Sequence, residues 1–400
     1  MSKDKKRLVP VRRFKEFENA DAWEQRKLGE LAEIVRGASP RPISDPKWFD
    51  ANSDVGWLRI SDVTNQNGRI RYLEQHISKL GQEKTRVITE PHLLLSIAAT
   101  VGKPLINYVK TGVHDGFLIF LNPKFDLEFM YQWLEMFRPE WNKYGQPGSQ
   151  VNLNSDLVKN QKIAIPSKEE QQKISNFFNE MDSLIALHQR KLDKLKRVKS
   201  AYLTEMFPAE GEREPKRRFP GFTGAWEQRK LGEVVEITMG QSPSSKNYTE
   251  NPNDHILVQG NADMKNGYVV PRVWTTQITK QAEKGDLILS VRAPVGDIGK
   301  TDYDVVLGRG VAAIKGNSFI FQLLTKMKIN GYWTRFSTGS TFESINSDNI
   351  KNAQISIPSL REQEKIGGLF NEFDSLIALH QRKLDKLQKL KNAYLNEMFV

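Results

Sequence analysis

The sequence predicts an α+β protein in which two mixed α/β domains alternate with two long helices that pair as an antiparallel coiled coil. Three observations predict this fold. Residues 23–30 recur letter for letter at 226–233, residues 182–195 recur at 374–387, and the stretches between them contain short apolar runs separated by turn residues. Identity over 14 consecutive residues does not arise by chance, so the chain is an internal duplication with pseudo-two-fold symmetry.

The repeat divides the chain into six parts. These are an N-terminal arm (1–22), a first domain (23–163), a first helix (164–207), a linker (208–225), a second domain (226–355) and a second helix (356–400). Within the domains, apolar runs between Gly, Asn and Pro turns predict strands at 93–98, 117–121, 287–291 and 311–314, and helices are expected at 129–137 and 319–328.

Each long helix begins at a serine cap and carries an apolar stripe. Ser167 and Glu170 have the spacing of a capping box, and Ser359 and Glu362 repeat it. Apolar residues then recur every three and four positions, which is the 3.5-residue period of a coiled coil. The predicted helix seam consists of Ile174, Phe178, Met181, Ile185, Leu192, Leu195, Ile366, Phe370, Phe373, Ile377, Leu384 and Leu387.

Polar residues interrupt the stripe at equivalent places in both helices. They are His188 and Lys199 in the first helix and His380 and Lys391 in the second. A buried polar residue in such a seam commonly fixes the register of the helices. We therefore expect the two histidines to set register rather than to bind a ligand.

Composition excludes several classes of protein. The chain has 400 residues, more than one ordinary core holds, and no cysteine, which excludes disulfides and thiolate chemistry. Its longest apolar run, near 93–99, is far shorter than the roughly 20 residues that span a bilayer, and no apolar segment follows the N-terminus, so a cytoplasmic protein is expected. A net charge of +11 favours a polyanionic partner, nucleic acid first, but leaves an acidic protein or membrane surface open.

Between the repeated ends, the two domains share only scattered anchors. Residues 37–40 match 240–243 in their glycine, serine and proline, and Asn154 matches Asn346, but most other positions differ. One frame with two different surfaces is what a protein that reads two different targets requires. Neutral drift of a purely structural domain would have altered the repeated ends as well.

Known catalytic signatures are missing or incomplete. The sequence has no G-x-x-x-x-G-K-S/T phosphate loop. Residues 308–313 imitate a dinucleotide-binding turn without a long helix after it, and residues 122–125 differ by a lysine from the Asn-Pro-Pro-Phe loop of amino-methyltransferases. A nuclease-like Glu-x-Lys string at 214–216 lies in the linker, and the six histidines show no metal-binding spacing. No catalytic or metal site is predicted.

The duplicated plan resembles the specificity (S) subunit of type I restriction-modification enzymes. The resemblance covers essentially the whole chain and rests on the repeated Trp-Glu-Gln-Arg-Lys-Leu-Gly-Glu and Asp-Ser-Leu-Ile-Ala-Leu-His-Gln-Arg-Lys-Leu strings. It implies that the two variable regions are target recognition domains, each reading one half of an asymmetric bipartite site in double-stranded DNA. It also implies that the helices set a fixed unread gap and dock two adenine-methylating modification subunits, which restriction (motor-nuclease) subunits join.

The same resemblance implies a non-catalytic chain that carries no cofactor of its own. S-adenosylmethionine would belong to the modification subunits, and ATP with Mg²⁺ chiefly to the restriction subunits. Two identical partners need two equivalent docking faces, which the repeated helix block supplies. Coiled-coil burial makes no demand on the basic residues of that block, so the predicted docking residues are Arg190, Lys191, Arg382 and Lys383.

Base edges in the major groove are read best by Arg or Lys on guanine and by Asn or Gln on adenine, from loops that a sheet holds still. The predicted DNA-binding residues are polar and cluster at turns that occupy equivalent positions in the two halves but differ in amino-acid sequence. In the first domain they are Arg36, Ser39, Arg41, Arg59, Ser61, Asn65, Gln66, Asn67, Arg69, Ser149, Gln150 and Asn152. In the second domain they are Gln241, Ser244, Ser245, Lys246, Gln259, Asn261, Lys265, Asn266, Arg292, Thr338, Ser340 and Thr341.

Two other classes of function remain open on the sequence. A self-contained methyltransferase or nuclease would modify or cut DNA as the purified chain. A protein-binding scaffold with no direct DNA readout would show no salt-dependent affinity for DNA. Phosphate contacts, in contrast, make the logarithm of the affinity fall linearly with the logarithm of the salt concentration.

Overall fold

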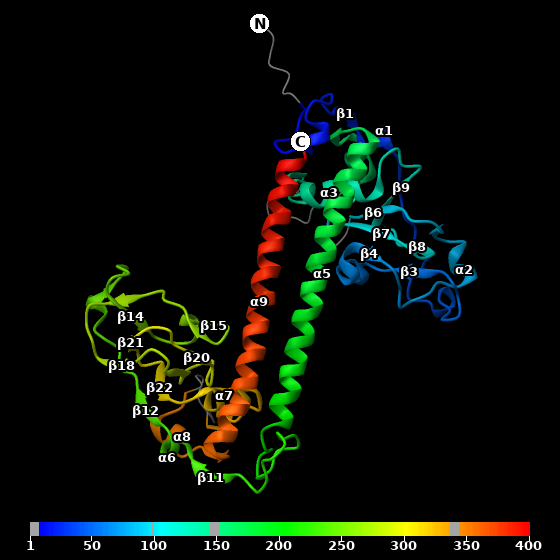
Figure 1. The fold of residues 1–400 in the computed structure, drawn as a ribbon. Coiled ribbons are helices and arrows are strands. Elements are labelled where there is room, and N and C mark those ends of the chain that lie inside the picture. The colour runs from blue at the N-terminus through cyan, green and yellow to red at the C-terminus, as the bar shows by residue number, and fades with distance from the viewer. Residues whose placement is uncertain (1–7, 98–99, 145–152, 337–343) are drawn as a thin grey trace. The chain divides into compact units, whose positions relative to one another are not determined.

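The structure is a computed structural model, and it describes residues 8–97, 100–144, 153–336 and 344–400. The chain forms two compact units (Figure 1). Unit 1 comprises residues 1–188 and 383–400, and unit 2 comprises residues 189–382. Each unit therefore contains one domain together with part of each long helix, α5 (Lys168–Glu205) and α9 (Leu360–Met398).

The domain of unit 1 is built on two sheets and a separate antiparallel pair of strands. The five-stranded sheet has the order β2 (Glu33–Arg36), β9 (Phe117–Leu121), β6 (Leu93–Ser96), β7 (Pro104–Asn107), β4 (Arg69–Ile70). The three-stranded sheet has the order β3 (Gly56–Leu58), β8 (Thr111–Val113), β5 (Arg86–Ile88), and β1 (Glu24–Lys27) pairs with β10 (Lys162–Ile165). The short helices are α1 (Leu28–Leu31), α2 (Lys79–Gln82), α3 (Leu127–Phe137) and α4 (Ser155–Asn160).

The domain of unit 2 repeats this plan. Its larger sheet has the order β12 (Glu236–Met239), β22 (Val311–Lys315), β19 (Leu287–Ser290), β20 (Ile298–Lys300), β16 (Tyr268–Val269), β15 (Met264–Lys265). Its second sheet has the order β13 (Tyr248–Thr249), β17 (Trp274–Thr275), β14 (His255–Val258), β21 (Val305–Leu307), β18 (Lys280–Ala282), and β11 (Glu227–Lys230) pairs with β23 (Gln354–Ile357). The helices are α6 (Leu231–Val234), α7 (Ser318–Ile329) and α8 (Ser347–Lys351).

The strand order shows that the duplication extends through the diverged regions. The order β12-β22-β19-β20-β16 repeats β2-β9-β6-β7-β4, and β14-β21-β18 repeats β3-β8-β5. The strands and helices predicted in these regions are present as β6, β9, β19, β22, α3 and α7. The four strands are buried along nearly their whole length, and the two helices each bury an apolar face.

The segments that recur in the sequence form the frame of each domain. β1 runs antiparallel to β10, and β11 runs antiparallel to β23. Trp23 and Trp226, which open the repeated strings, are almost fully buried and pack edge-on against Phe129 and Phe319, with ring centroids 6.1 and 5.6 Å apart. The nearly unchanged sequence therefore encodes the base from which each variable region projects.

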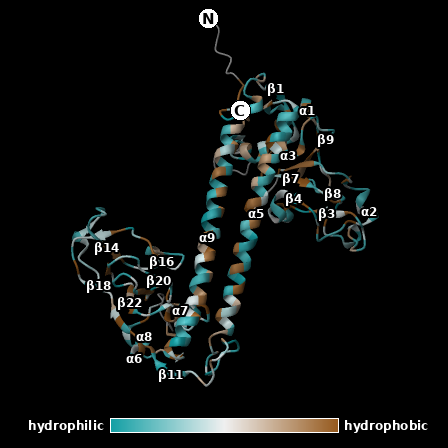
Figure 2. Ribbon diagram, in the orientation of Figure 1, coloured by the Kyte–Doolittle hydropathy of each residue, from teal (hydrophilic) through white to brown (hydrophobic). Residues whose placement is uncertain are grey.

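The predicted seam is buried, and α5 and α9 run antiparallel where they contact each other inside each unit. Every predicted seam residue is buried or half-buried, and Figure 2 shows hydrophobic and hydrophilic residues alternating along both helices. In unit 1 the ring centroid of Phe177 lies 5.2 Å from that of Tyr394. In unit 2 the centroid of Tyr202 lies 5.5 Å from that of Phe373.

Ion pairs explain the lysines that interrupt the stripe. Lys391 lies 2.5 Å from Asp182 in unit 1, and Lys199 lies 2.6 Å from Asp374 in unit 2. The second oxygen of each aspartate accepts a 2.9 Å hydrogen bond from a glutamine of the domain, Gln132 of α3 or Gln322 of α7. The same polar cluster thus ties each domain to both long helices. The histidines at 188 and 380 are half-buried in the seam.

The capping boxes predicted for the long helices form only in part. The Ser167 hydroxyl accepts the backbone N–H of Glu170 at 3.3 Å, as expected. The Glu170 carboxylate, however, accepts two 2.7 Å hydrogen bonds from Arg13, and Arg218 binds Glu362 in the same way at 2.7 and 2.8 Å. The capping-box prediction is therefore wrong for both glutamates, because a charged guanidinium competes with a backbone amide for the carboxylate.

Candidate nucleic-acid interface

Each domain carries a rim where three loops meet beside its sheets. Rim 1 consists of the loop after β2 (37–46), the segment after β3 (59–62) and the β8–β9 turn (114–116). Rim 2 consists of the corresponding segments of unit 2, which are the loop after β12 (240–247), the segment after β14 (259–263) and the β21–β22 turn (308–310).

Matching hydrogen bonds hold the backbones of the two rims. The amide of Gly37 donates to the carbonyl of Phe117 at 2.9 Å, and the amide of Gly240 donates to the carbonyl of Val311 at 3.0 Å. A Cβ atom added at Gly37 or Gly240 would lie 2.2 or 2.0 Å from a carbonyl oxygen of the neighbouring turn. Glycine is required at both positions because the loop passes directly against the turn.

A serine hydroxyl fixes the turn in both rims. Ser39 Oγ accepts the backbone N–H of Asp115 at 3.1 Å, and Ser242 Oγ accepts the backbone N–H of Arg309 at 3.0 Å. Asp115 and Arg309 therefore occupy equivalent positions on the same frame. Their side chains carry opposite charges.

At rim 1, Asp115 binds three of the predicted DNA-binding residues, two through its carboxylate and one through its backbone carbonyl. Ser39 donates to one carboxylate oxygen at 2.8 Å, Arg41 donates to the other at 2.7 Å, and Arg36 donates to the Asp115 carbonyl at 2.6 Å. Burial raises the pKa of Asp115, but the hydrogen bond from Ser39 and the nearby positive charges outweigh it, and the pKa lies below its usual value. Asp115 is therefore ionised at neutral pH.

His114 is a neutral neighbour of this cluster. Burial lowers the pKa of His114, whose ring lies 5.8 Å from that of Trp57. The amide of Gly116 lies 2.8 Å from Nδ1 of His114. An oxygen of Asp115 lies 3.1 Å from the same nitrogen, a contact that becomes an ion pair only when His114 is protonated, which its lowered pKa disfavours.

The first residues after β3 and β14 form a second equivalent pair. The backbone N–H of Arg59 donates to Asp62 at 2.8 Å, and that of Gln259 donates to Asp263 at 2.7 Å. The Arg59 guanidinium also binds Asp62, which raises the pKa of Arg59, whereas the Gln259 amide donates to the hydroxyl of Tyr248 at 2.9 Å. Rim 1 thus presents an arginine where rim 2 presents a glutamine.

The other predicted residues of the two rims lie at the surface. Ser61 is exposed in unit 1. Among the predicted DNA-binding residues at rim 2, Asn261 is half-buried and the exposed ones are Gln241, Ser244, Ser245, Lys246 and Arg292. Arg292 lies beside rim 2, because the preceding residue, Val291, donates its amide to the carbonyl of Gly310 at 2.9 Å.

A second group of predicted residues lies outside the rims, and two of them, Arg69 and Asn266, lie beside the long helices. The Arg69 guanidinium lies 3.8 Å from the ring centroid of Tyr131 and binds Glu128 at 2.5 Å and Asp182 at 3.4 Å. Its side chain is only 15% exposed, so Arg69 is committed to contacts within unit 1. Gln66 is bonded to the backbone of the following turn, Asn65 belongs to the 3-10 helix Ile60–Gly68, and Asn67, Lys265 and Asn266 are exposed.

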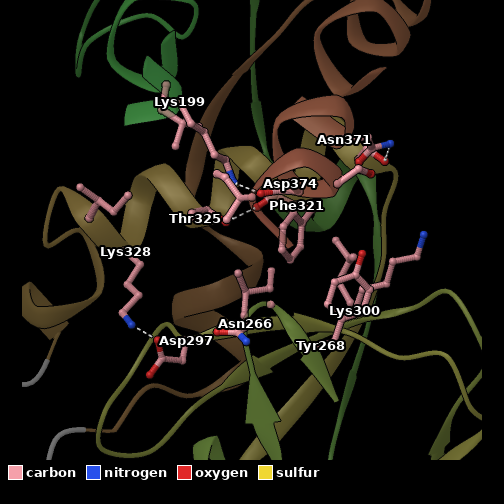
Figure 3. Close-up of a pocket in the computed structure, with 18 of the residues that line it drawn as sticks. Lys199, Asn266, Tyr268, Asp297, Lys300, Phe321, Thr325, Lys328, Asn371 and Asp374 are labelled. Atoms are coloured by element: carbon pink, nitrogen blue, oxygen red, sulfur yellow. Dashed lines mark hydrogen bonds and ion pairs between the residues drawn. The ribbon is translucent and has the colours of Figure 1, made fainter. Parts of the chain in front are cut away.

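In unit 2 the position equivalent to Arg69 is Tyr268, and a cleft opens beside it (Figure 3). The cleft has a volume of about 880 Å³ and is lined by α5, α7, α9 and the β15–β16 turn. Figure 3 shows Lys199 paired with Asp374 on one wall and Lys328 paired with Asp297 on another. Unit 1 fills this place with the Arg69 network, so the two halves differ here as well.

The remaining predicted residues divide into two sets. Those outside the described residues are Ser149, Gln150, Asn152, Thr338, Ser340 and Thr341. The predicted docking residues are all exposed on the long helices, and they are Arg190, Lys191, Arg382 and Lys383.

Replacing Asp115 by alanine is expected to lower the free energy of unfolding by about 2 kcal/mol, because charge-assisted hydrogen bonds to a partly buried carboxylate are lost. Denaturant-induced unfolding measures this change. Asp54→Ala is the matched control, since Asp54 makes only an exposed ion pair with Lys110, and it should cost less than about 0.5 kcal/mol. Equal losses in the two variants would contradict the assigned role of Asp115.

Sequence reasoning missed Asp115 and Arg309. Their equivalence is visible only through the backbone, because the two turns share no letters beyond a glycine. The one sequence signal at Arg309 was the Gly-Arg-Gly string at 308–310, which imitates a dinucleotide-binding turn. In the structure a strand, β22, follows this turn instead of a helix.

Among the described residues, no group of three or more His, Asp or Glu side chains is placed to hold a metal ion. No helix in the described ranges is long and apolar enough to cross a membrane. The chain thus contains one frame twice, and the two copies carry surfaces of different chemistry. The chain belongs to the family described as type I restriction modification DNA specificity domain, which matches residues 20–197 and 224–389.

Relatives of known family cover nearly the whole chain. It is 25% identical to the putative type I restriction enzyme MjaX specificity subunit of Methanocaldococcus jannaschii, over 94% of this chain and 92% of that one. It is 23% identical to the type I restriction enzyme EcoprrI specificity subunit of Escherichia coli, over 84% of each chain. Specificity subunits are the non-catalytic members of type I systems, which agrees with the missing catalytic signatures.

Solved structures share the fold. The crystal structure of the type I restriction-modification S subunit from M. genitalium has a TM-score of 0.67 at 13% identity, over 98% of this chain and 99% of that one. A chain from a structure that describes complex assembly and conformational transition of the type I restriction-modification system has a TM-score of 0.53 at 22% identity, over 94% of this chain and 97% of that one.

Proposed function

We propose that this chain reads an asymmetric bipartite site in double-stranded DNA, with rim 1 on one half-site and rim 2 on the other. The observation that carries the proposal is the pair of rims. Matching hydrogen bonds hold their backbones, while equivalent positions present Asp115 against Arg309 and Arg59 against Gln259. Two recognition surfaces that have the same backbone but different side chains would recognise different bases.

Charge supports a DNA partner. The net charge of +11 attracts a polyanionic duplex, and the Arg and Lys residues around the rims would bind phosphates, which positions the protein without specifying sequence. In this proposal the predicted DNA-binding residues of the two rims contact bases, and the predicted residues next to the long helices support the domains.

The long helices would dock two modification subunits, each an adenine methyltransferase. The identical blocks 182–195 and 374–387 offer two equivalent surfaces, each with an exposed Arg-Lys pair, and two equivalent surfaces suit two copies of one partner. S-adenosylmethionine would then be bound by the modification subunits, and ATP with Mg²⁺ by the restriction subunits that complete the assembly. This assembly would act in the cytoplasm, where its DNA target lies.

Sequencing of methylated DNA from cells that carry the complete system tests the proposal. The methylated sites are expected to share two half-sites of different sequence, separated by a gap of constant length. For the purified complex, the logarithm of the DNA affinity should fall linearly with the logarithm of the salt concentration. A single uninterrupted site, or methylation that does not depend on this chain, would instead favour the alternative of a protein-binding scaffold with no direct DNA readout.

A further inference from the structure

The β21–β22 turn holds Arg309 between two glycines that pack against rim 2. A Cβ atom added at Gly308 would lie 3.0 Å from the Cα of Gln259, and one added at Gly310 would lie 2.1 Å from its carbonyl oxygen. The hydroxyl of Ser242 accepts the Arg309 amide at 3.0 Å. The backbone at Arg309 is therefore fixed from both sides, and its side chain starts from a rigid point.

The side chain of Arg309 is exposed. No ion pair or side-chain hydrogen bond joins it to another residue in the described part of the chain. The arginines of rim 1 differ in this respect, because Arg41 lies 2.7 Å from Asp115 and Arg59 lies 2.8 Å from Asp62. Among the described residues, the guanidinium donors of Arg309 in rim 2 are therefore unpaired, whereas the arginines Arg41 and Arg59 of rim 1 are paired with aspartates.

Guanine presents the acceptors that such a group requires. Its O6 and N7 atoms face the major groove, and two N–H groups of one arginine can bind both together. A phosphate would also accept hydrogen bonds from this guanidinium. A phosphate contact depends mainly on charge and does not require a rigid backbone at the arginine, whereas a bidentate base contact depends on geometry. The rigid turn supplies that geometry.

A neighbouring side chain has complementary base-reading chemistry. Gln259 packs against both glycines of the turn, and its Nε2 is anchored by a 2.9 Å hydrogen bond to the hydroxyl of Tyr248. Its Oε1 makes no hydrogen bond with another described residue. An anchored glutamine with a free carbonyl is suited to the donor and acceptor edge of adenine.

We infer that Arg309 recognises a guanine in the second half-site and is a specificity-determining residue of the second domain. The inference rests on the proposed function and adds one residue and one base to it. The first domain lacks the equivalent contact, because its turn presents Asp115, whose carboxylate is occupied by Ser39 and Arg41.

The test is the methylated sequence produced by the complete system that carries Arg309→Ala. The requirement for guanine at one position of the second half-site should be lost, with discrimination at that position reduced about 10- to 100-fold. The first half-site should stay unchanged. Arg309→Lys keeps a charged donor without the fork and should retain a weaker preference for guanine at the same position.

Lys315→Ala is the matched control. Lys315 lies at the other end of β22 and pairs with Glu283, so its loss removes one positive charge from the domain without touching rim 2. The methylated sequence should be unchanged in this variant.

Binding of the purified Arg309→Ala complex to duplexes altered at single positions separates a base contact from a phosphate contact.

Two results would overturn the inference. One is an unchanged methylated sequence in Arg309→Ala. The other is equal weakening on every duplex together with a smaller salt dependence, which would assign Arg309 to a phosphate. Both leave the proposed function standing, because the wild-type chain can read a bipartite site whichever residue contacts this base.

Discussion

Replacing Arg13 by alanine is expected to lower the free energy of unfolding by about 3–5 kcal/mol. Arg13 makes two 2.7 Å hydrogen bonds to Glu170, and the side chains of the pair are only 6% and 2% exposed. The alanine variant leaves the Glu170 carboxylate buried at the start of α5 without its charged partner. Denaturant-induced unfolding of the purified chain measures the loss.

Three further variants separate this mechanism from a general effect of losing charge. Arg12→Ala breaks an exposed pair with Glu397 and should cost at most about 1 kcal/mol. Arg218→Ala should match Arg13→Ala, because Arg218 binds the buried Glu362 in unit 2. Replacing Arg13 by methionine and Glu170 by leucine together should restore most of the stability, since no buried charge then lacks a partner. Similar small losses for Arg12→Ala and Arg13→Ala would refute the explanation.

These pairs give a structural reason for a shorter sequence match ahead of each domain, Arg-Arg-Phe at 12–14 and at 217–219. The arm before the first domain and the linker before the second both contain two consecutive arginines. The first of each pair binds a glutamate near the end of a long helix, Arg12 to Glu397 at 2.6 Å and Arg217 to Glu205 at 2.5 Å. The second binds the buried glutamate at the start of a long helix. The arm and the linker are therefore the same structural element used twice.

The sequence predicts those parts of the fold that local patterns encode. The 3.5-residue period predicts both long helices, and the apolar runs predict the central strands, because each pattern is contained in the segment that forms the element. Partners that are remote in sequence leave no such signal. Ser39 and Asp115 are 76 residues apart, and Asp182 and Lys391 are 209 residues apart, so neither pair could be anticipated from spacing.

The candidate site was predictable only at the level of loops. Polar residues at the turns that the two halves share indicate the segments that form the rims, and Arg41 and Gln259 lie in these segments. Residue type alone could not separate them from Arg69, whose strand register turns it toward Tyr131 and the long helix. Arg309 was not predicted, because the sequence of its turn shares only one glycine with the equivalent turn of the first half.

Exchanging variable regions inside the chain should change one half of the methylated site completely. In the proposed variant, residues 234–353 replace residues 31–161, so that both frames carry the second variable region. Both half-sites are then expected to contain the bases of the original second half-site, because each rim reads independently of the frame that carries it. Sequencing of methylated DNA from cells with the otherwise complete system measures the outcome.

The frames should accept this exchange because two of their main contacts to the variable regions are matched. The incoming α7 brings Phe319 to the place of Phe129 beneath Trp23, and Gln322 to the place of Gln132 beside Asp182. The reciprocal exchange, residues 31–161 into the second frame, is the control and should yield two copies of the first half-site. If either exchange altered both half-sites, the two rims would not be independent readers. If neither altered the site, base recognition would belong to a partner and the chain would be a scaffold.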